Sequence, residues 1–294
     1  MTISKVGVLG CGLMGSGIAQ TAAAAGFTTV ARDVTAPLLE KGRAGIARSL
    51  GKLVEKGKLT TAGRDAALSR LSFQTDLAAL RDCDIVVEAV TEDLDLKNRL
   101  WQELDRLCPP RTIFASNTSS LTIAAMSAAT ERPDRFVGLH FFNPVPLMPL
   151  VEVVRTVTTS DATFDQAVEF ARALGKEPVA ASDQPGFIVN LLLVPFLLDA
   201  TRALERRVAT TSDIDRGIQL GCGHPMGPLT LLDFIGLDTV VRIADIMFDA
   251  YRDTRYAPPP LLRRMVVAGQ LGRKSGRGFY DYGADPPVPL DLGL

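Results

Sequence analysis

Short apolar runs alternate with longer amphipathic stretches through the first half of the chain. The amphipathic stretches have helical spacing; one of them, residues 94–107, places its leucines and its tryptophan on one helical face. The apolar runs have the length and composition of strands that are buried on both faces. Five of these runs are Val6–Leu9, Thr28–Ala31, Ile85–Ala89, Ile113–Ser116 and Phe136–His140. The alternation predicts an α/β fold with a Rossmann-like doubly wound sheet.

The pattern changes near residue 183. Before it, we predict two more strands around a helix: Leu150–Val154, Ala162–Leu174 and Glu177–Ala180. After the turn-forming sequence Asp183–Gly186, only helical patterns follow. These predicted helices are Phe187–Arg206, Ser212–Leu220, Leu229–Tyr251 and Leu261–Ala268. We therefore expect a nucleotide-binding domain over residues 1–183 and an all-helical domain over residues 184–294. The proline-rich tail from about residue 283 is expected to be poorly ordered.

The first predicted strand runs directly into a glycine-rich turn of the form G-x-G-x-x-G. Gly10 permits the tight turn, Gly12 lets the backbone approach a diphosphate, and Gly15 allows the next helix to pack closely on the strand. The N-terminus of that helix offers free N–H groups to phosphate oxygens. Asp33 follows the second strand and can accept hydrogen bonds from ribose hydroxyls. The order of strand, turn, helix, strand and acid predicts binding of NAD rather than NADP.

Composition excludes several other classes of protein. The 294 residues are 47% apolar and carry a net charge of −1, which gives no sign of nucleic-acid binding. The four cysteines and two histidines lack the spacing of a metal site or a disulfide framework. The longest apolar run, Phe187–Leu198, is too short to span a bilayer, and the N-terminus lacks a signal peptide. We expect a cytoplasmic protein without a metal ion and without membrane attachment.

A histidine and a glutamate form the candidate catalytic pair. His140 ends a predicted strand, at the edge of the sheet where ligands of such folds bind. A turn with two prolines, Asn143–Pro146, separates it from the strand that contains Glu152, so the chain can reverse there. A carboxylate on one imidazole nitrogen would leave the other nitrogen to exchange a proton with an alcohol. From spacing alone, a structural role for His140 remains the alternative.

Long stretches of the chain resemble the short-chain L-3-hydroxyacyl-CoA dehydrogenase family. The matching segments are GCGLMGSGIA at Gly10–Ala19, VVEAVTEDLDLK at Val86–Lys97, FASNTSSL at Phe114–Leu121, GLHFFNPVPLMPLVEVV at Gly138–Val154, PGFIVN at Pro185–Asn190, GHPMGPLTLLDFIGLDT at Gly223–Thr239 and GRKSGRGFYDY at Gly272–Tyr282. The resemblance covers nearly the whole chain. It implies NAD-dependent, reversible oxidation of an L-3-hydroxyacyl-CoA, and a homodimer formed through the helical domain.

The resemblance also implies roles for individual residues. His140 corresponds to the family's catalytic base and Glu152 to its carboxylate partner. Ser119 corresponds to a hydroxyl that contacts the substrate oxygen, and Asn190 to an amide that contacts the acyl group. The alternatives from the residues themselves are an N-cap for Ser119 and a cap or turn for Asn190. The residues expected to contact NAD are Gly10, Gly12, Leu13, Met14, Gly15, Asp33, Glu92 and Lys97.

Three further points remain open at the level of sequence. Glu92 and Lys97 could equally mark a solvated helix start. Ser49 and Lys56 correspond to the region that contacts the CoA phosphates, although a solvated helix face fits the same charge pattern. Leu191 and Pro149 stand where relatives carry basic residues, which leaves the acyl-chain preference undecided.

The expected substrate is a short-chain thioester such as 3-hydroxybutyryl-CoA. Related activities on 3-hydroxyadipyl-CoA, a carrier-protein thioester or a sugar acid are the alternatives among enzymes. A crystallin-like structural protein or a nucleotide-binding sensor would not need the complete set of four polar site residues.

Overall fold

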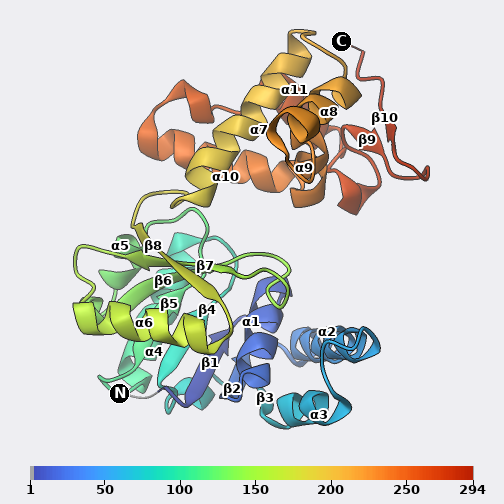
Figure 1. The fold of residues 1–294 in the computed structure, drawn as a ribbon. Helices are drawn as coiled ribbons and strands as arrows, with labels where there is room; N and C mark the ends of the chain where they lie inside the picture. Colours follow the sequence, from blue (N-terminus) through green and yellow to red (C-terminus); the bar gives the residue numbers. More distant parts are fainter. Residues whose placement is uncertain (1–2, 294) are drawn as a thin grey trace. The chain divides into compact units, whose positions relative to one another are not determined.

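The computed structural model describes residues 3–293, which form two compact units that divide after Phe187 (Figure 1). The sequence-based boundary, residue 183, lies directly after the last strand of the first unit, β8 (Glu177–Ser182). The turn-forming segment Asp183–Gly186 comes just before this division, at the end of the first unit, and Gly186 has a φ of 86°.

The first unit is built on an eight-stranded sheet with the order β3-β2-β1-β4-β5-β6-β7-β8. The strands before β8 are β1 (Lys5–Leu9), β2 (Thr28–Arg32), β3 (Leu71–Gln74), β4 (Ile85–Glu88), β5 (Ile113–Ser116), β6 (Phe136–Phe141) and β7 (Leu150–Arg155). Neighbouring strands are parallel except β6 and β7, which are antiparallel. The sheet confirms the doubly wound α/β prediction and places the carboxyl ends of β1, β4, β5 and β6 at one edge.

Helices cover both faces of this sheet. They are α1 (Leu13–Ala24), α2 (Ala36–Glu55), α3 (Thr61–Ser69), α4 (Leu94–Leu107), α5 (Ile123–Ser127) and α6 (Asp161–Ala173), with the 3₁₀ turns η1 (Leu77–Leu80) and η2 (Pro133–Arg135). One core contains Val87 together with Ile18 and Phe170 from α1 and α6. The other contains the adjacent strand residue Val86 and Trp101 from α4. Successive strand residues thus enter opposite cores, which explains the continuous apolar runs.

The second unit is mainly helical. Its elements are α7 (Val189–Glu205), α8 (Thr211–Cys222), α9 (Pro228–Ile235), α10 (Leu237–Tyr251), η3 (Thr254–Tyr256), α11 (Pro260–Val267), η4 (Arg273–Ser275), β9 (Tyr280–Asp281) and β10 (Val288–Pro289). These helices enclose a core of their own that includes Leu197, Leu232 and Phe279. No helix within residues 3–293 is both long enough and apolar enough to cross a membrane.

Two sequence-based expectations about elements are wrong, and one strand is missing from the sequence-based prediction. The single helix expected over Leu229–Tyr251 is two helices, because Gly236 has a φ of 102°, which breaks the helix. The tail expected to be disordered from about residue 283 contains β10, which pairs antiparallel with β9. β3 was not predicted, since this edge strand is only partly buried and has no continuous apolar run.

Candidate active site

The glycine-rich turn between β1 and α1 leaves space for a nucleotide. Gly10 has a φ of 98°, and a Cβ there would lie 2.7 Å from the Ala89 carbonyl oxygen. A Cβ on Gly15 would lie 1.9 Å from the Gly10 carbonyl oxygen, so the turn and α1 pack without side chains. A Cβ on Gly12 would meet no described atom within 4 Å. The open space lies at the first turn of α1, next to Leu13 and Met14, where backbone N–H groups can bind a diphosphate.

Asp33 is tied to this turn from the end of β2. Its Oδ2 accepts a hydrogen bond of 2.7 Å from the Cys11 backbone N–H, and its Oδ1 accepts one of 2.7 Å from Val34. A carboxylate has about four lone-pair positions, so the fixed group can still accept from ribose hydroxyls. The neighbouring Arg32 donates to the Thr75 carbonyl oxygen at 3.1 Å, and this contact holds its guanidinium toward β3. The turn and Asp33 therefore fit the NAD that the sequence predicts.

Two adjoining cavities extend from this turn along α2. The first, of about 480 Å³, is lined by Gly12 and Leu13, by Ser49, and by Asn143 from the turn after β6. The second, of about 350 Å³, is also lined by Ser49 and adds Lys56. The structure thus places the predicted CoA residue Ser49 on the cavity beside the dinucleotide turn and on the adjoining cavity that Lys56 also lines. Asn143 was not assigned to the cofactor from sequence, although it follows a strand that points to this edge.

His140 and Glu152 lie side by side on the antiparallel pair β6–β7. The register pairs the two residues directly, and His140 Nδ1 lies 2.6 Å from Glu152 Oε2. His140 is 6% exposed and Glu152 is fully buried. The rings of Phe142 and Phe187 lie 4.5 and 5.6 Å from the imidazole, centroid to centroid. The chain reverses at the proline-containing turn as expected, and the pair has the geometry of an imidazole held by a carboxylate.

Ser119 lies in the loop after β5, and Glu92 anchors that loop. The Ser119 N–H donates to Glu92 Oε1 at 3.2 Å, and the hydroxyls of Thr118 and Ser120 donate to the same oxygen. Asn117, at the start of the loop, accepts a 2.9 Å hydrogen bond from the Phe141 N–H with its Oδ1, so the loop is joined to the strand of His140.

The N-cap alternative for Ser119 is wrong. The N-cap of α5 is Thr122, and the two carboxylate oxygens of Asp183 accept from the first N–H groups of that helix, at Ile123 and Ala124, both at 2.7 Å. Ser119 thus precedes the helix without capping it. Asn190 is the second residue of α7, in the second unit, and its predicted contact with the acyl group stays a prediction.

Lys97 is buried and Glu92 is mostly buried, with 17% of its side chain exposed, so neither forms the fully solvated helix start that the sequence left open. The Lys97 side chain is 1% exposed, and its Nζ lies 3.2 Å from Glu92 Oε2. Burial favours an action of Lys97 through Glu92 rather than through direct contact of its ammonium with a cofactor. Glu92 has a lowered pKa: burial would raise it, but the charge of Lys97 and the hydroxyls of Thr118 and Ser120 outweigh burial. Glu92 therefore stays ionised in the site.

The site has the parts of a nucleotide-dependent dehydrogenase, and comparison with known proteins assigns it to a family. The family model "3-hydroxyacyl-CoA dehydrogenase, NAD binding domain" matches residues 5–184, and the model of the C-terminal domain of the same enzymes matches residues 186–282. The chain belongs to the 3-hydroxyacyl-CoA dehydrogenase family. It is an NAD-dependent oxidoreductase, and the resemblance found in the sequence is confirmed.

Individual members of the family are similar over almost their full length. A 3-hydroxybutyryl-CoA dehydrogenase of Mycobacterium tuberculosis is 51% identical over 282 residues, covering 95% of this chain and 99% of the relative. The mitochondrial hydroxyacyl-coenzyme A dehydrogenase of Homo sapiens is 48% identical, covering 95% and 91%. The crystal structure of (S)-3-hydroxybutyryl-CoA dehydrogenase from Ralstonia eutropha is 44% identical and matches with a TM-score of 0.92, covering 96% and 99%.

Proposed function

We propose that this 3-hydroxyacyl-CoA dehydrogenase family member interconverts a short-chain L-3-hydroxyacyl-CoA, such as 3-hydroxybutyryl-CoA, and the 3-oxoacyl-CoA, with His140 as the general acid and base. The observation that carries the proposal is the 2.6 Å contact between His140 Nδ1 and Glu152 Oε2 at the carboxyl edge of the sheet. The names of the similar proteins from M. tuberculosis and R. eutropha support the hydroxybutyryl group as the acyl part.

The pair would move one proton in each turnover. Glu152 accepts the hydrogen bond from Nδ1–H, so the proton-free nitrogen of the neutral ring is Nε2. In the oxidation direction Nε2 takes the proton of the 3-hydroxyl group, and Glu152 stabilises the imidazolium that forms. In the reverse direction the imidazolium returns the proton to the 3-oxo oxygen. NAD, when bound, supplies the acceptor for the hydride that leaves the carbinol carbon.

The surrounding residues would orient the substrate and keep water away. The Ser119 hydroxyl is on a loop fixed by Glu92 and by the contact from Asn117 to β6, so it can bind the substrate oxygen without first being ordered. Phe142 and Phe187 cover the imidazole with apolar surface, which strengthens electrostatic interactions there. Asn190 is assigned to the acyl group on the family resemblance.

A CoA thioester is supported by the basic hollow beside α2. Its lining includes Arg48, Lys52, Lys56 and Lys58, together with the hydroxyl of Ser49. Cationic side chains and a hydroxyl group suit the phosphates of CoA. Such remote contacts would supply binding energy that positions the reacting carbon. A free four-carbon acid has no CoA group and would not make these contacts.

Substrate comparison tests this function directly. With NADH, purified protein should reduce acetoacetyl-CoA, and kcat/KM for free acetoacetate should be lower by roughly 10²-fold or more, or about 2.7 kcal/mol. The carrier-protein thioester and a free sugar acid complete the series. Equal kcat/KM for free acid and CoA ester would refute the CoA assignment, and preference for the carrier thioester would change the proposed carrier.

We also propose that the protein is a homodimer and that it works in the cytoplasm. Apolar side chains such as Leu192 and Leu220 on α7 and α8 are about 70% exposed, and a dimer interface on the second unit would bury them. The described cysteines are unpaired, which suits a reducing compartment. Sedimentation equilibrium tests the assembly, and cell fractionation tests the location; a monomer or a membrane-bound pool would count against these proposals.

A further inference from the structure

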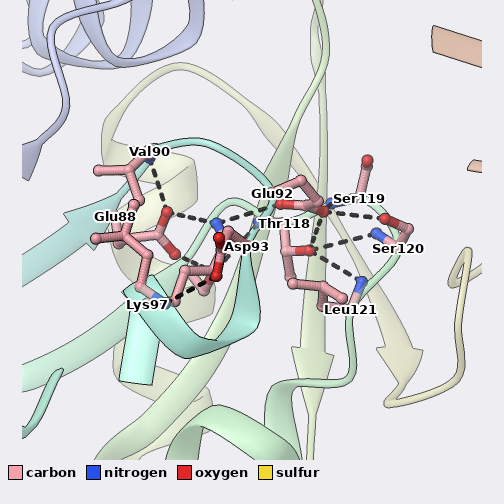
Figure 2. Close-up of polar contacts among 11 residues, drawn as sticks. Glu88, Val90, Glu92, Asp93, Lys97, Thr118, Ser119, Ser120 and Leu121 are labelled. Carbon is pink, nitrogen blue, oxygen red and sulfur yellow. Dashed lines mark hydrogen bonds and ion pairs between the residues drawn. The ribbon is translucent and has the colours of Figure 1, made fainter. Parts of the chain in front are cut away.

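A largely buried row of charged side chains, Glu88, Lys97 and Glu92, joins the end of β4 to the loop that carries Ser119 (Figure 2). It begins at Glu88, the last residue of β4, which is fully buried. The Lys97 ammonium lies 2.5 Å from Glu88 Oε1 and 3.2 Å from Glu92 Oε2, so one cation serves two carboxylates. Glu92 in turn accepts hydrogen bonds from the Thr118–Ser120 segment. Each step from Glu88 to Ser119 is a direct polar contact.

Glu88 also fixes the main chain and the neighbouring strand. Its Oε1 accepts a 2.8 Å hydrogen bond from the Val90 N–H, at the turn that leaves β4. Its Oε2 accepts a 2.6 Å hydrogen bond from the Ser116 hydroxyl, at the end of β5. Glu88 therefore contacts the start of both segments that hold Glu92 and Ser119. Glu88 is not among the residues that line the two cavities described above.

Packing alone does not explain a glutamate at this position. The neighbouring strand residues Ile85, Val86 and Val87 are apolar and fully buried. Replacing a buried ion pair with apolar side chains is often neutral for stability, because desolvation offsets the attraction. If the charge of Glu88 adds little to stability, its benefit is the order that it imposes on its neighbours. Here these neighbours are the ends of β4 and β5, next to the dinucleotide turn.

We propose that Glu88 is a positioning residue for the dehydrogenase reaction. It holds the Lys97 ammonium, which holds the Glu92 carboxylate, which fixes the backbone and hydroxyls of the Thr118–Ser120 segment and so the position of Ser119. Glu88 touches neither substrate nor cofactor and acts through the other members of the row. The inference rests on the proposed function for the role of Ser119, whereas the row itself follows from the contacts.

The first test is Glu88→Gln, with Asp105→Asn as the matched control. Glutamine keeps the size of the side chain and an oxygen for the Val90 N–H, but it removes the charge that holds Lys97. Asp105 forms another buried ion pair of this unit, with its Oδ1 2.5 Å from Arg132 Nε. Asp105 precedes β5 and Arg132 precedes β6 along the chain, so this pair lies toward the amino ends of those strands. Both variants lose one carboxylate charge from a buried pair, but only Glu88 lies at the ligand edge.

We expect Glu88→Gln to weaken NADH binding, measured by fluorescence, and to lower kcat with acetoacetyl-CoA, each by roughly tenfold, the size of coupling seen between contacting charged groups. Asp105→Asn should lower the melting temperature without changing the NADH dissociation constant. Glu88→Asp, which keeps the charge, should recover part of both losses. Wild-type NADH binding and turnover in Glu88→Gln, or a loss of melting temperature alone as in the control, would overturn the proposal.

Two further variants separate the possible failures. If Glu88→Gln does not fold, the double variant Glu88→Gln with Lys97→Met removes both charges of the buried pair and should fold. Its NADH binding should remain weak, and wild-type NADH binding in this double variant would contradict the proposal. Combining Glu88→Gln with Ser119→Ala should lower kcat by less than the product of the two single effects, and full additivity would show that Glu88 does not act through Ser119. NADH binding reports on Glu88 even if acetoacetyl-CoA is not the substrate.

Discussion

The two units both bury carboxylates, but they stabilise them differently. In the first unit, Glu88 and Glu92 share the ammonium of Lys97 at the edge of the sheet. In the second unit, Asp215 and Asp233 are 4% and 1% exposed and accept hydrogen bonds from N–H and hydroxyl groups. Within residues 3–293, no lysine or arginine forms an ion pair with either aspartate.

The partners of the two aspartates show what these charges do. Asp215 on α8 accepts from the first N–H groups of α9, at Leu229 and Thr230, and from the Tyr280 hydroxyl. Asp233 on α9 accepts from the N–H groups of Phe279 and Tyr280. Both carboxylates join helices to the C-terminal segment. The comparison teaches that the carboxylates sharing Lys97 in the first unit order the strand ends beside the candidate site, whereas the two buried aspartates of the second unit connect distant parts of the chain.

The sharpest test of this contrast uses the two histidines. We expect His140→Ala to lower kcat by roughly 10²–10⁴, the range for loss of a general acid and base, with NADH binding nearly unchanged. His224→Ala, in the second unit, removes a ring that lies 5.7 Å from Phe196 and should leave kcat close to the wild-type value. Steady-state kinetics at fixed folded-protein concentration measures both. Unchanged turnover per folded molecule in His140→Ala would favour a structural role.

Glu152→Gln tests whether the buried carboxylate of the first unit acts on its histidine. The neutral amide does not stabilise an imidazolium, so the acidic limb of the kcat/KM profile for oxidation should move to lower pH. The plateau should fall by roughly 10–100-fold, since proton transfer loses part of its driving force. An unmoved profile with full activity would show that the 2.6 Å contact is not used in turnover.

Asp233→Asn tests the structural side of the comparison through pH. Burial raises the pKa of Asp233 to about 6, although its N–H partners and Tyr282 lower it and Asp215 raises it further. The native state therefore holds this proton more tightly than the unfolded chain, whose aspartates titrate near 4. The stability from Asp233 is complete at low pH and is lost as the pH rises through about 6.

The free energy of unfolding of the wild type, relative to Asp233→Asn, should thus fall by on the order of 2–3 kcal/mol between pH 4 and pH 7. Urea unfolding across that range measures the difference. Asp249→Asn, which breaks an exposed ion pair with Arg252, is the control and should change stability little at any pH. A difference between wild type and Asp233→Asn that does not vary with pH would contradict the assignment.

The smallest expected effect concerns the basic hollow beside α2. Lys56→Ala should raise KM for acetoacetyl-CoA by roughly fivefold, about 1 kcal/mol, with kcat nearly unchanged, because the contact is remote from the reacting carbon. The rise of KM with added salt should also become weaker, since a phosphate contact has been lost. Arg81→Ala, which alters an exposed pair with Asp82, is the control. A wild-type KM in Lys56→Ala would refute the placement of CoA beside α2 but would leave the proposed CoA thioester substrate standing.

Sequence patterns could predict the features that depend on local chemistry. The strand before Gly10 and the acid at Asp33 follow from spacing, and His140 with Glu152 follows from strand ends and a proline-containing turn. Glu88 could not be assigned, because an acid at the end of an apolar strand has the same pattern whether it faces solvent or a buried lysine. The partner, Lys97, is on the next helix, and only the fold brings the two together.

Elsewhere, tertiary contacts overrode the local pattern. The apolar periodicity continues from Leu229 to Tyr251, and the break appears only because Gly236 adopts a backbone conformation that other residues avoid. Pro286, Pro287 and Pro289 suggested disorder, but the pairing of Val288 with Asp281 organises that segment. In both cases a backbone conformation or a distant pairing decided the outcome.

The antiparallel register of β6 and β7 makes the contact between His140 and Glu152 depend on the number of residues in each strand. Side chains alternate between the two faces of a strand, so one residue added within 136–141 or 150–155 would turn His140 or Glu152 to the opposite face and separate them. Residues 142–149 connect the two strands, and their number can change without turning either side chain to the other face. The hydrogen bonds between β6 and β7 keep the register of the strands in that case. Among related proteins, insertions and deletions should therefore occur in the connection and be rare within the two strands, whatever side chains the inserted residues carry.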